Sequence, residues 1–104
     1  MKPRQIVLTE AAINDILEQA AWYEEKSGAK LARRWEQAVS AILLRIASTP
    51  AIGAPCSFKA AELESVRRMP VPHFPRHLLF YRLRGQEMVI LRIVHGARDL
   101  ESLF

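Results

Sequence analysis

The sequence contains a single cysteine, Cys56, among its 104 residues. One cysteine excludes an internal disulfide and any zinc cluster built from several cysteines. Apolar runs long enough to span a membrane are absent, and no apolar stretch of signal-peptide length follows the basic residues at the N-terminus. We therefore expect a protein of a reducing compartment, the cytoplasm, with no membrane partner.

Internal repeats, low-complexity tracts and linkers are also absent from the sequence. Hydrophobic residues make up 50% of the chain and charged residues 25%, which is a globular rather than a disordered composition. A chain of this length buries enough surface to fold without disulfides or metals. We expect one domain over residues 1–104.

Acidic residues are scarce in one part of the chain. Residues 65–98 contain seven arginines but one acid, Glu87, and they also contain all three histidines. Arginine binds carboxylates and phosphates through paired hydrogen bonds, and eleven of the fifteen basic residues are arginine. Each arginine alone is explained by the solvent side of a sheet. The cluster as a whole predicts contact with an anionic partner.

Helical periodicity covers most of the first half. Residues 5–8 favour a strand, and Thr9 can cap a helix that ends near Gly28. A second helix follows at once and stops before Pro50. The expected apolar stripes are Ile13, Ile16, Leu17, Ala20 and Tyr23 on the first helix, and Leu31, Trp35, Ala38, Val39, Ile42 and Ile46 on the second. The short connection makes them an antiparallel hairpin, and their length argues against a DNA-binding helix-turn-helix.

The second half has the pattern of strands. Residues 51–64 predict a loop, residues 66–71 an irregular or edge strand, and residues 76–83 and 87–94 two strands joined by a turn at Gly85-Gln86. With this turn Arg84 faces Glu87, and residues 78, 80, 82 and 84 share one side of the sheet with 87, 89, 91, 93 and 95. Gly96 is expected to adopt a positive φ after the last strand.

The predicted element order is therefore β-α-α-β-β-β, an α+β fold. An N-terminal strand precedes an antiparallel helical hairpin. The hairpin packs on a small sheet that ends in a C-terminal antiparallel meander. The strand at 87–94 is apolar on both sides, as expected for a central position in the sheet.

Two segments, Phe80-Tyr81-Arg82-Leu83-Arg84-Gly85 and Ile90-Leu91-Arg92-Ile93-Val94-His95-Gly96-Ala97-Arg98-Asp99, carry a resemblance to a known family. With the element order, they resemble the RelE/ParE superfamily of type II toxins, and the second segment is closest to the ParE branch. The resemblance implies a toxin that is neutralised by a cognate antitoxin with an acidic C-terminal segment, encoded by the adjacent gene. ParE-type toxins act on DNA gyrase and block replication, whereas RelE-type toxins cleave mRNA on the ribosome.

Three departures from the RelE pattern count against ribonuclease activity. Leu78 stands where RelE-like enzymes typically have an arginine, Phe104 stands in place of a C-terminal tyrosine, and Lys59 is the one lysine in the loop. Gyrase poisoning without enzymatic chemistry is the favoured interpretation. A ribonuclease that uses His95 and Arg82 stays open as the alternative, as does an inactive remnant that still binds its antitoxin.

Candidate residues follow from these interpretations. Contact with the toxin's target is assigned to Arg92, His95, Arg98 and Asp99, around the glycine break at the end of the last strand. Antitoxin binding is assigned to an exposed tryptophan on the first helix and to sheet arginines: Trp22, Arg67, Arg68, Arg76 and Arg82. The competing interpretation of Arg98 and His95 is structural, through bonds that hold the tail and the loop. No metal or cofactor site is predicted, because His73, His77 and His95 are too scattered in the sequence.

Overall fold

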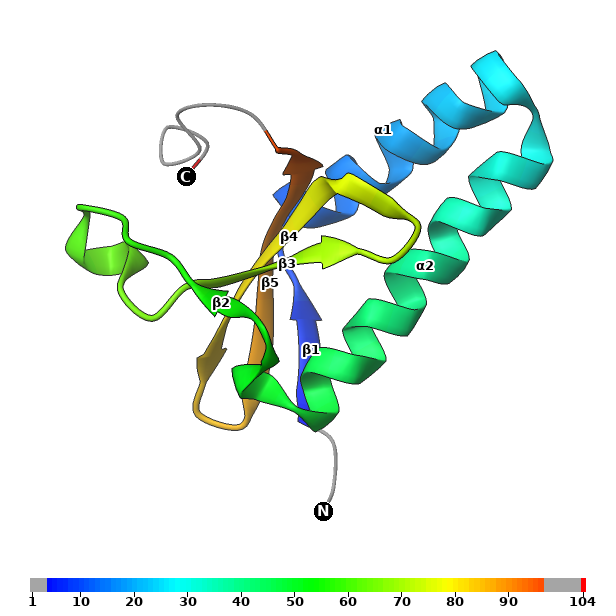
Figure 1. The fold of residues 1–104 in the computed structure, drawn as a ribbon. Coiled ribbons are helices and arrows are strands. Elements are labelled where there is room, and N and C mark those ends of the chain that lie inside the picture. The colour runs from blue at the N-terminus through cyan, green and yellow to red at the C-terminus, as the bar shows by residue number, and fades with distance from the viewer. Residues whose placement is uncertain (1–3, 97–103) are drawn as a thin grey trace.

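Figure 1 shows the fold in a computed structural model that describes residues 4–96 and 104. Strand β1 precedes two helices, and four further strands follow. The elements are β1 (Gln5–Leu8), α1 (Glu10–Ser27), α2 (Ala29–Ser48), β2 (Ala54–Pro55), β3 (Arg67–Val71), β4 (Phe74–Arg84) and β5 (Glu87–His95). The sheet order is β1-β5-β4-β3-β2, with β1 parallel to β5 and all other pairs antiparallel. The α+β fold and the central position of β5 are therefore confirmed.

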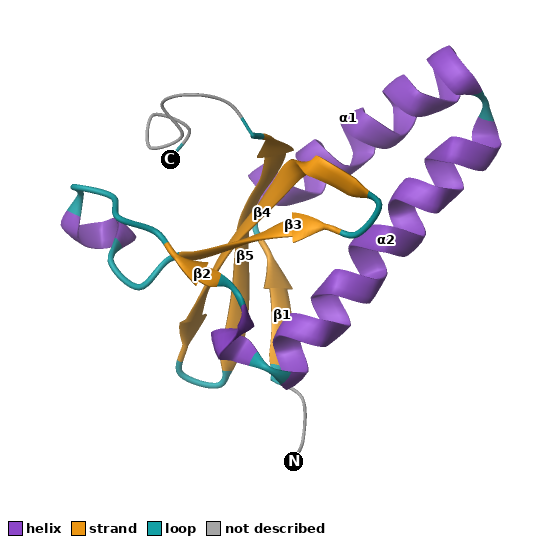
Figure 2. Ribbon diagram, viewed as in Figure 1, coloured by secondary structure: helices purple, strands orange, loops and turns teal. Residues whose placement is uncertain are grey.

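The two helices form a hairpin against one side of the sheet (Figure 2). The Thr9 side chain caps α1 by accepting a hydrogen bond from the Ala12 N–H at 3.1 Å. Gly28 lies between the helices with φ +91° and ψ 168°, a region that is open almost only to glycine. Among the described residues, neither helix is long and apolar enough to cross a membrane.

The core lies between the hairpin and the sheet, and α2 contributes most of it. Seven residues of α2 are buried, including the whole of Trp35, whereas Ala12 is the buried residue of α1. The predicted stripe of α1 is wrong at two positions, because Ile13 is 41% exposed and Leu17 is 58% exposed. The helix is rotated so that its Asp15 side meets β5, and this rotation turns Ile13 and Leu17 toward solvent.

The hairpin of β4 and β5 has the expected turn but not the expected register throughout. Arg84 lies opposite Glu87, and their side chains form an ion pair at 3.5 Å. Tyr81 then pairs with residue 90 but residue 80 pairs with Arg92, so Leu91 is an extra residue, a β-bulge. Beyond the bulge each β5 side chain points to the side opposite from the one predicted. Residues 93 and 95 therefore lie with residues 77 and 79, on the helix side.

The segment predicted as a loop contains more structure than expected. It holds β2 and two short 3₁₀ helices, η1 (Pro50–Ile52) and η2 (Ala61–Leu63). Buried Tyr81 fixes its start: the hydroxyl donates to the Pro50 carbonyl and accepts from the Gly53 N–H, both at 2.8 Å. At the end of β5, Gly96 does not adopt the positive φ that we predicted. A Cβ on Gly96 would instead lie only 3.2 Å from the Arg76 carbonyl oxygen.

Candidate functional site

A groove of about 710 Å³ opens between α1 and the adjoining ends of β4 and β5. Helix α1 supplies one wall, and the start of β4 and the end of β5 supply the other. The lining residues are Asp15, Glu18, Gln19, Trp22 and Tyr23 on the helix and Phe74, Pro75, Arg76, His77, Ile93, Val94 and His95 on the strands. The groove therefore depends on how α1 is fixed along β5.

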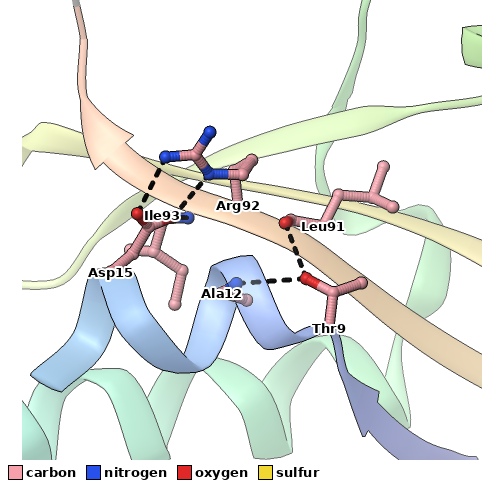
Figure 3. Close-up of polar contacts among 6 residues, drawn as sticks. All are labelled: Thr9, Ala12, Asp15, Leu91, Arg92 and Ile93. Atoms are coloured by element: carbon pink, nitrogen blue, oxygen red, sulfur yellow. Dashed lines mark hydrogen bonds and ion pairs between the residues drawn. The ribbon is translucent and has the colours of Figure 1, made fainter. Parts of the chain in front are cut away.

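Asp15 fixes this position (Figure 3). Its carboxylate accepts hydrogen bonds from Arg92 Nε and Nη2, both at 2.8 Å, and from the Ile93 backbone N–H at 3.0 Å. Six residues earlier, at the N-cap of α1, the Thr9 hydroxyl donates to the Leu91 carbonyl at 2.9 Å. Strand β1 pairs with β5 only as far as Ile90, so these two α1 contacts satisfy backbone groups beyond the end of that ladder. The bond to Asp15 raises the pKa of Arg92 above its usual value.

The floor of the groove is a cluster of rings around His77. Its ring centroid lies 4.8 Å from that of Trp35, 6.3 Å from Tyr23 and 5.4 Å from His95. His77 is 7% exposed, and burial, followed by the nearby His95, lowers its pKa. Burial therefore disfavours the charged imidazole, and the ring packs among the aromatic side chains of the floor. Within residues 4–96, no three His, Cys, Asp or Glu side chains gather in a way that could hold a metal ion.

The rim of the groove is exposed and carries polar and aromatic side chains. Trp22 is 53% exposed and lies edge-on to Tyr23 at 5.7 Å, while His95 and Arg76 are exposed on the opposite side. Burial raises the pKa of Tyr23, so its hydroxyl stays protonated at neutral pH. An apolar floor with a polar rim suits an amphipathic segment of a partner protein better than it suits acid–base chemistry.

The residues predicted to contact the target are not all available for that role. His95 lies on the groove rim, but the guanidinium of Arg92 is engaged by Asp15. Arg98 and Asp99 lie outside the described residues. The alternative catalytic residues, His95 and Arg82, are not brought together. His95 pairs with residue 77 and Arg82 is five residues further along β4, which is about 17 Å at 3.3 Å per residue.

The predicted antitoxin-binding residues also separate. Trp22 and Arg76 line the groove, whereas Arg68 and Arg82 lie on the side of the sheet away from the helices. Arg67 serves the fold, since its Nη1 donates to the Gly53 carbonyl at 2.7 Å. Sequence reasoning missed Asp15 and His77. In the sequence, Asp15 is an acid beside an apolar stripe, which does not indicate a contact with a strand. His77 and His95 lie opposite each other only because of the β-bulge at Leu91.

Comparisons with known proteins agree with this fold. Residues 6–100 match the model of the ParE toxin of the type II toxin-antitoxin system, parDE. The chain belongs to the ParE toxin family. A search of curated proteins finds no match.

Solved structures share the fold of this ParE family member at low sequence identity. A chain of the chromosomal ParDE system from P. aeruginosa has a TM-score of 0.74 at 19% identity, covering 90% of this chain and 97% of that one. A chain of the RelBE2 toxin–antitoxin complex from Mycobacterium tuberculosis has a TM-score of 0.63 at 18% identity, covering 90% of this chain and 99% of that one. The YoeB/ParE toxin from Agrobacterium tumefaciens has a TM-score of 0.57 at 15% identity, covering 89% of this chain and 99% of that one. These likenesses show a shared fold.

Proposed function

We propose that this protein is the toxin of a type II toxin–antitoxin pair, that it poisons DNA gyrase in the cytoplasm, and that a cognate antitoxin neutralises it. The match to the ParE toxin model over residues 6–100 is the observation that carries the proposal. Structures described as toxin–antitoxin systems share the fold and supply the precedent for an antitoxin partner.

The groove beside α1 is the proposed site for the antitoxin. Its ring-lined floor offers apolar anchorage, and Trp22 stands half exposed at its edge. Tryptophan is enriched among the few residues that dominate binding energy at protein interfaces. Arg76 on the opposite rim can pair with a carboxylate of an acidic antitoxin segment. The partner's apolar side chains would then fill the groove while its acidic residues meet the rim.

Gyrase is favoured over mRNA as the target by the separation of the candidate catalytic groups. RNA cleavage needs an acid or base beside cations that stabilise the phosphate. Arg82 lies about 17 Å along β4 from the residue opposite His95, so the two groups of the alternative catalytic pair are too far apart to act on one phosphate. Target contact is assigned to the exposed His95 together with Arg98 and Asp99.

Two assays with the purified chain test the target. Incubation with gyrase, DNA and ATP should block supercoiling and accumulate cleaved DNA, whereas mRNA in a translation extract should stay intact. In cells, induction should cause filamentation and DNA damage signalling before protein synthesis stops. Rapid mRNA cleavage with normal gyrase activity would establish the ribonuclease alternative. Inactivity in both assays would indicate a non-toxic remnant.

A pair of variants tests the groove. Trp22→Ala should weaken antitoxin affinity by tenfold or more, since an interface anchor contributes at least about 1.4 kcal/mol. Leu44→Ala is the matched control, because Leu44 is an apolar residue of α2, 65% exposed, that does not line the groove. Equal affinities for the two variants would place the antitoxin elsewhere.

A further inference from the structure

The side of the sheet opposite the helices carries a compact group of arginines. Residues alternate along β4, so the buried Leu79 and Tyr81 face the helices, while Phe80, Arg82 and Arg84 face away. On β3, Arg68 lies directly opposite Phe80. Figure 2 shows both helices on the other side of the sheet. We call Arg68, Arg82 and Arg84 the open-face arginines.

Little of this positive charge is neutralised by neighbours. Arg84 has a partner in Glu87, at 3.5 Å with both side chains well exposed. Arg82 Nη1 donates to the backbone carbonyl of Glu62 at 2.7 Å and not to its carboxylate. Among the described residues, neither Arg68 nor Arg82 forms an ion pair with a carboxylate. Arg68 and Arg84 are exposed, whereas Arg82 is half-buried and its Nε is buried, so an external anion reaches Arg68 and Arg84 most directly.

Aromatic rings on this side stack on one another. The centroids of Phe58 and Phe104 lie 5.5 Å apart, and Phe80 lies 6.2 Å from Phe58 and 5.5 Å from Phe104. Phe80 is fully buried, Val89 opposite Arg82 is 5% exposed, and Phe104 is 39% exposed. Single-stranded nucleic acids need free ring faces for base stacking, and peptides need apolar anchors. Among the described residues, this side offers one exposed ring, Phe104, beside its arginines, and arginines suit phosphates.

We propose that the open-face arginines bind the phosphate backbone of double-stranded DNA without sequence preference. Arg82 and Arg84 are two residues apart, about 7 Å along β4, and Arg68 extends the group onto β3. Backbone contacts of this kind give affinity and orientation but do not read the bases. The surface lies across the sheet from the proposed antitoxin groove. The inference stands whether or not gyrase is the target, and it would bring a gyrase poison to that enzyme's DNA.

Anisotropy of a fluorescent 20-base-pair duplex with the purified chain, measured between 50 and 200 mM salt, tests the proposal. Three phosphate contacts predict a slope of log affinity against log salt of about −2.7, at about −0.9 per contact. Two duplexes of unrelated sequence should bind equally. Tighter binding of single-stranded RNA of the same length would overturn the proposal, as would complete displacement of the duplex by equimolar polyglutamate.

Variants that are expected to weaken DNA binding and one that is expected to strengthen it make the test specific. Arg68→Ala and Arg84→Ala should each reduce the slope by about one, since each removes one phosphate contact. Glu87→Gln should raise affinity several-fold, because it releases Arg84 from its ion pair. Arg33→Ala, at an exposed arginine of α2, is the control and should change nothing. Thermal unfolding confirms that each variant is folded.

The outcomes separate this inference from the proposed function. The DNA-binding proposal would be wrong if Arg33→Ala and Arg68→Ala gave equal slopes of log affinity against log salt. It would also be wrong if Glu87→Gln bound the duplex more weakly than the parent protein. If the chain fails to bind DNA but still inhibits gyrase, the inference falls and the gyrase proposal stands. If it binds DNA through these arginines but leaves gyrase active, the inference stands and the gyrase proposal falls.

Discussion

Replacement of Asp15 by alanine should destabilise the protein strongly. The substitution removes the acceptor of two Arg92 bonds at 2.8 Å and of the Ile93 N–H bond at 3.0 Å. The two side chains are largely shielded, with 11% of Asp15 and 23% of Arg92 exposed. Breaking a fully buried pair costs about 3–5 kcal/mol, and the remaining exposure reduces this to about 2 kcal/mol. The unpaired Ile93 amide adds about 1 kcal/mol.

The expected total is about 3 kcal/mol, which for a chain of this length lowers Tm by roughly 12 °C. Urea unfolding followed by circular dichroism measures the loss of unfolding free energy, and a thermal scan measures the change in Tm. Asn14→Ala is the control, because Asn14 lies next to Asp15 on α1 and is exposed, and it should cost less than about 0.5 kcal/mol. In the double variant Asp15→Ala/Arg92→Ala, the second change should add little, with a coupling free energy of about 2 kcal/mol. A loss below about 1 kcal/mol for Asp15→Ala, or additive losses in the double variant, would refute this account of how α1 is held.

Three further predictions concern the core and its pH dependence. Tyr81→Phe should cost about 1–3 kcal/mol in urea unfolding, since it leaves the buried Gly53 N–H and Pro50 carbonyl unpaired. Gly53→Ala should lower Tm, because its Cβ would lie 2.6 Å from the Tyr81 hydroxyl, and a Tm equal to that of the parent would contradict this. The fold lowers the pKa of His77, so below about pH 6.5 the unfolded chain binds the proton first and stability is lost as the pH falls. His77→Gln should weaken this loss between pH 7 and pH 5, whereas His73→Gln, at an exposed position, should leave it unchanged.

The helices could be predicted because their signals are local. Thr9 caps α1, Gly28 separates the helices and Pro50 follows α2, and each acts within one turn of where it stands. The rotation of α1 could not be predicted in the same way. Ile13 and Leu17 have the spacing of core residues, but a contact with β5, far away in the sequence, decides which side of the helix is buried.

The bulge at Leu91 explains why the candidate site was only partly predictable. Its residues, Leu91-Arg92-Ile93, contain no glycine or proline to mark an irregularity. The three residues are held there by α1: the Leu91 carbonyl accepts from Thr9, and the other two donate to Asp15. The register of the hairpin therefore depends on contacts with residues 78 and 82 positions earlier in the sequence. Hairpin rules that consider only the turn cannot include this effect.

This dependence links the fold of the ParE family member to its two proposed surfaces. If β5 continued without the extra residue, His95 would turn away from His77, and Ile93 would leave the core. Below the bulge, toward the turn, the pairing of Arg84 with Glu87 and of Arg82 with Val89 is set by the turn alone. Arg82 and Arg84 therefore need only the hairpin, and Arg68 needs the pairing of β3 with β4, whereas the groove needs α1 held on the bulge. Changes at Asp15 should consequently impair antitoxin binding through the groove while they spare DNA binding by the arginines.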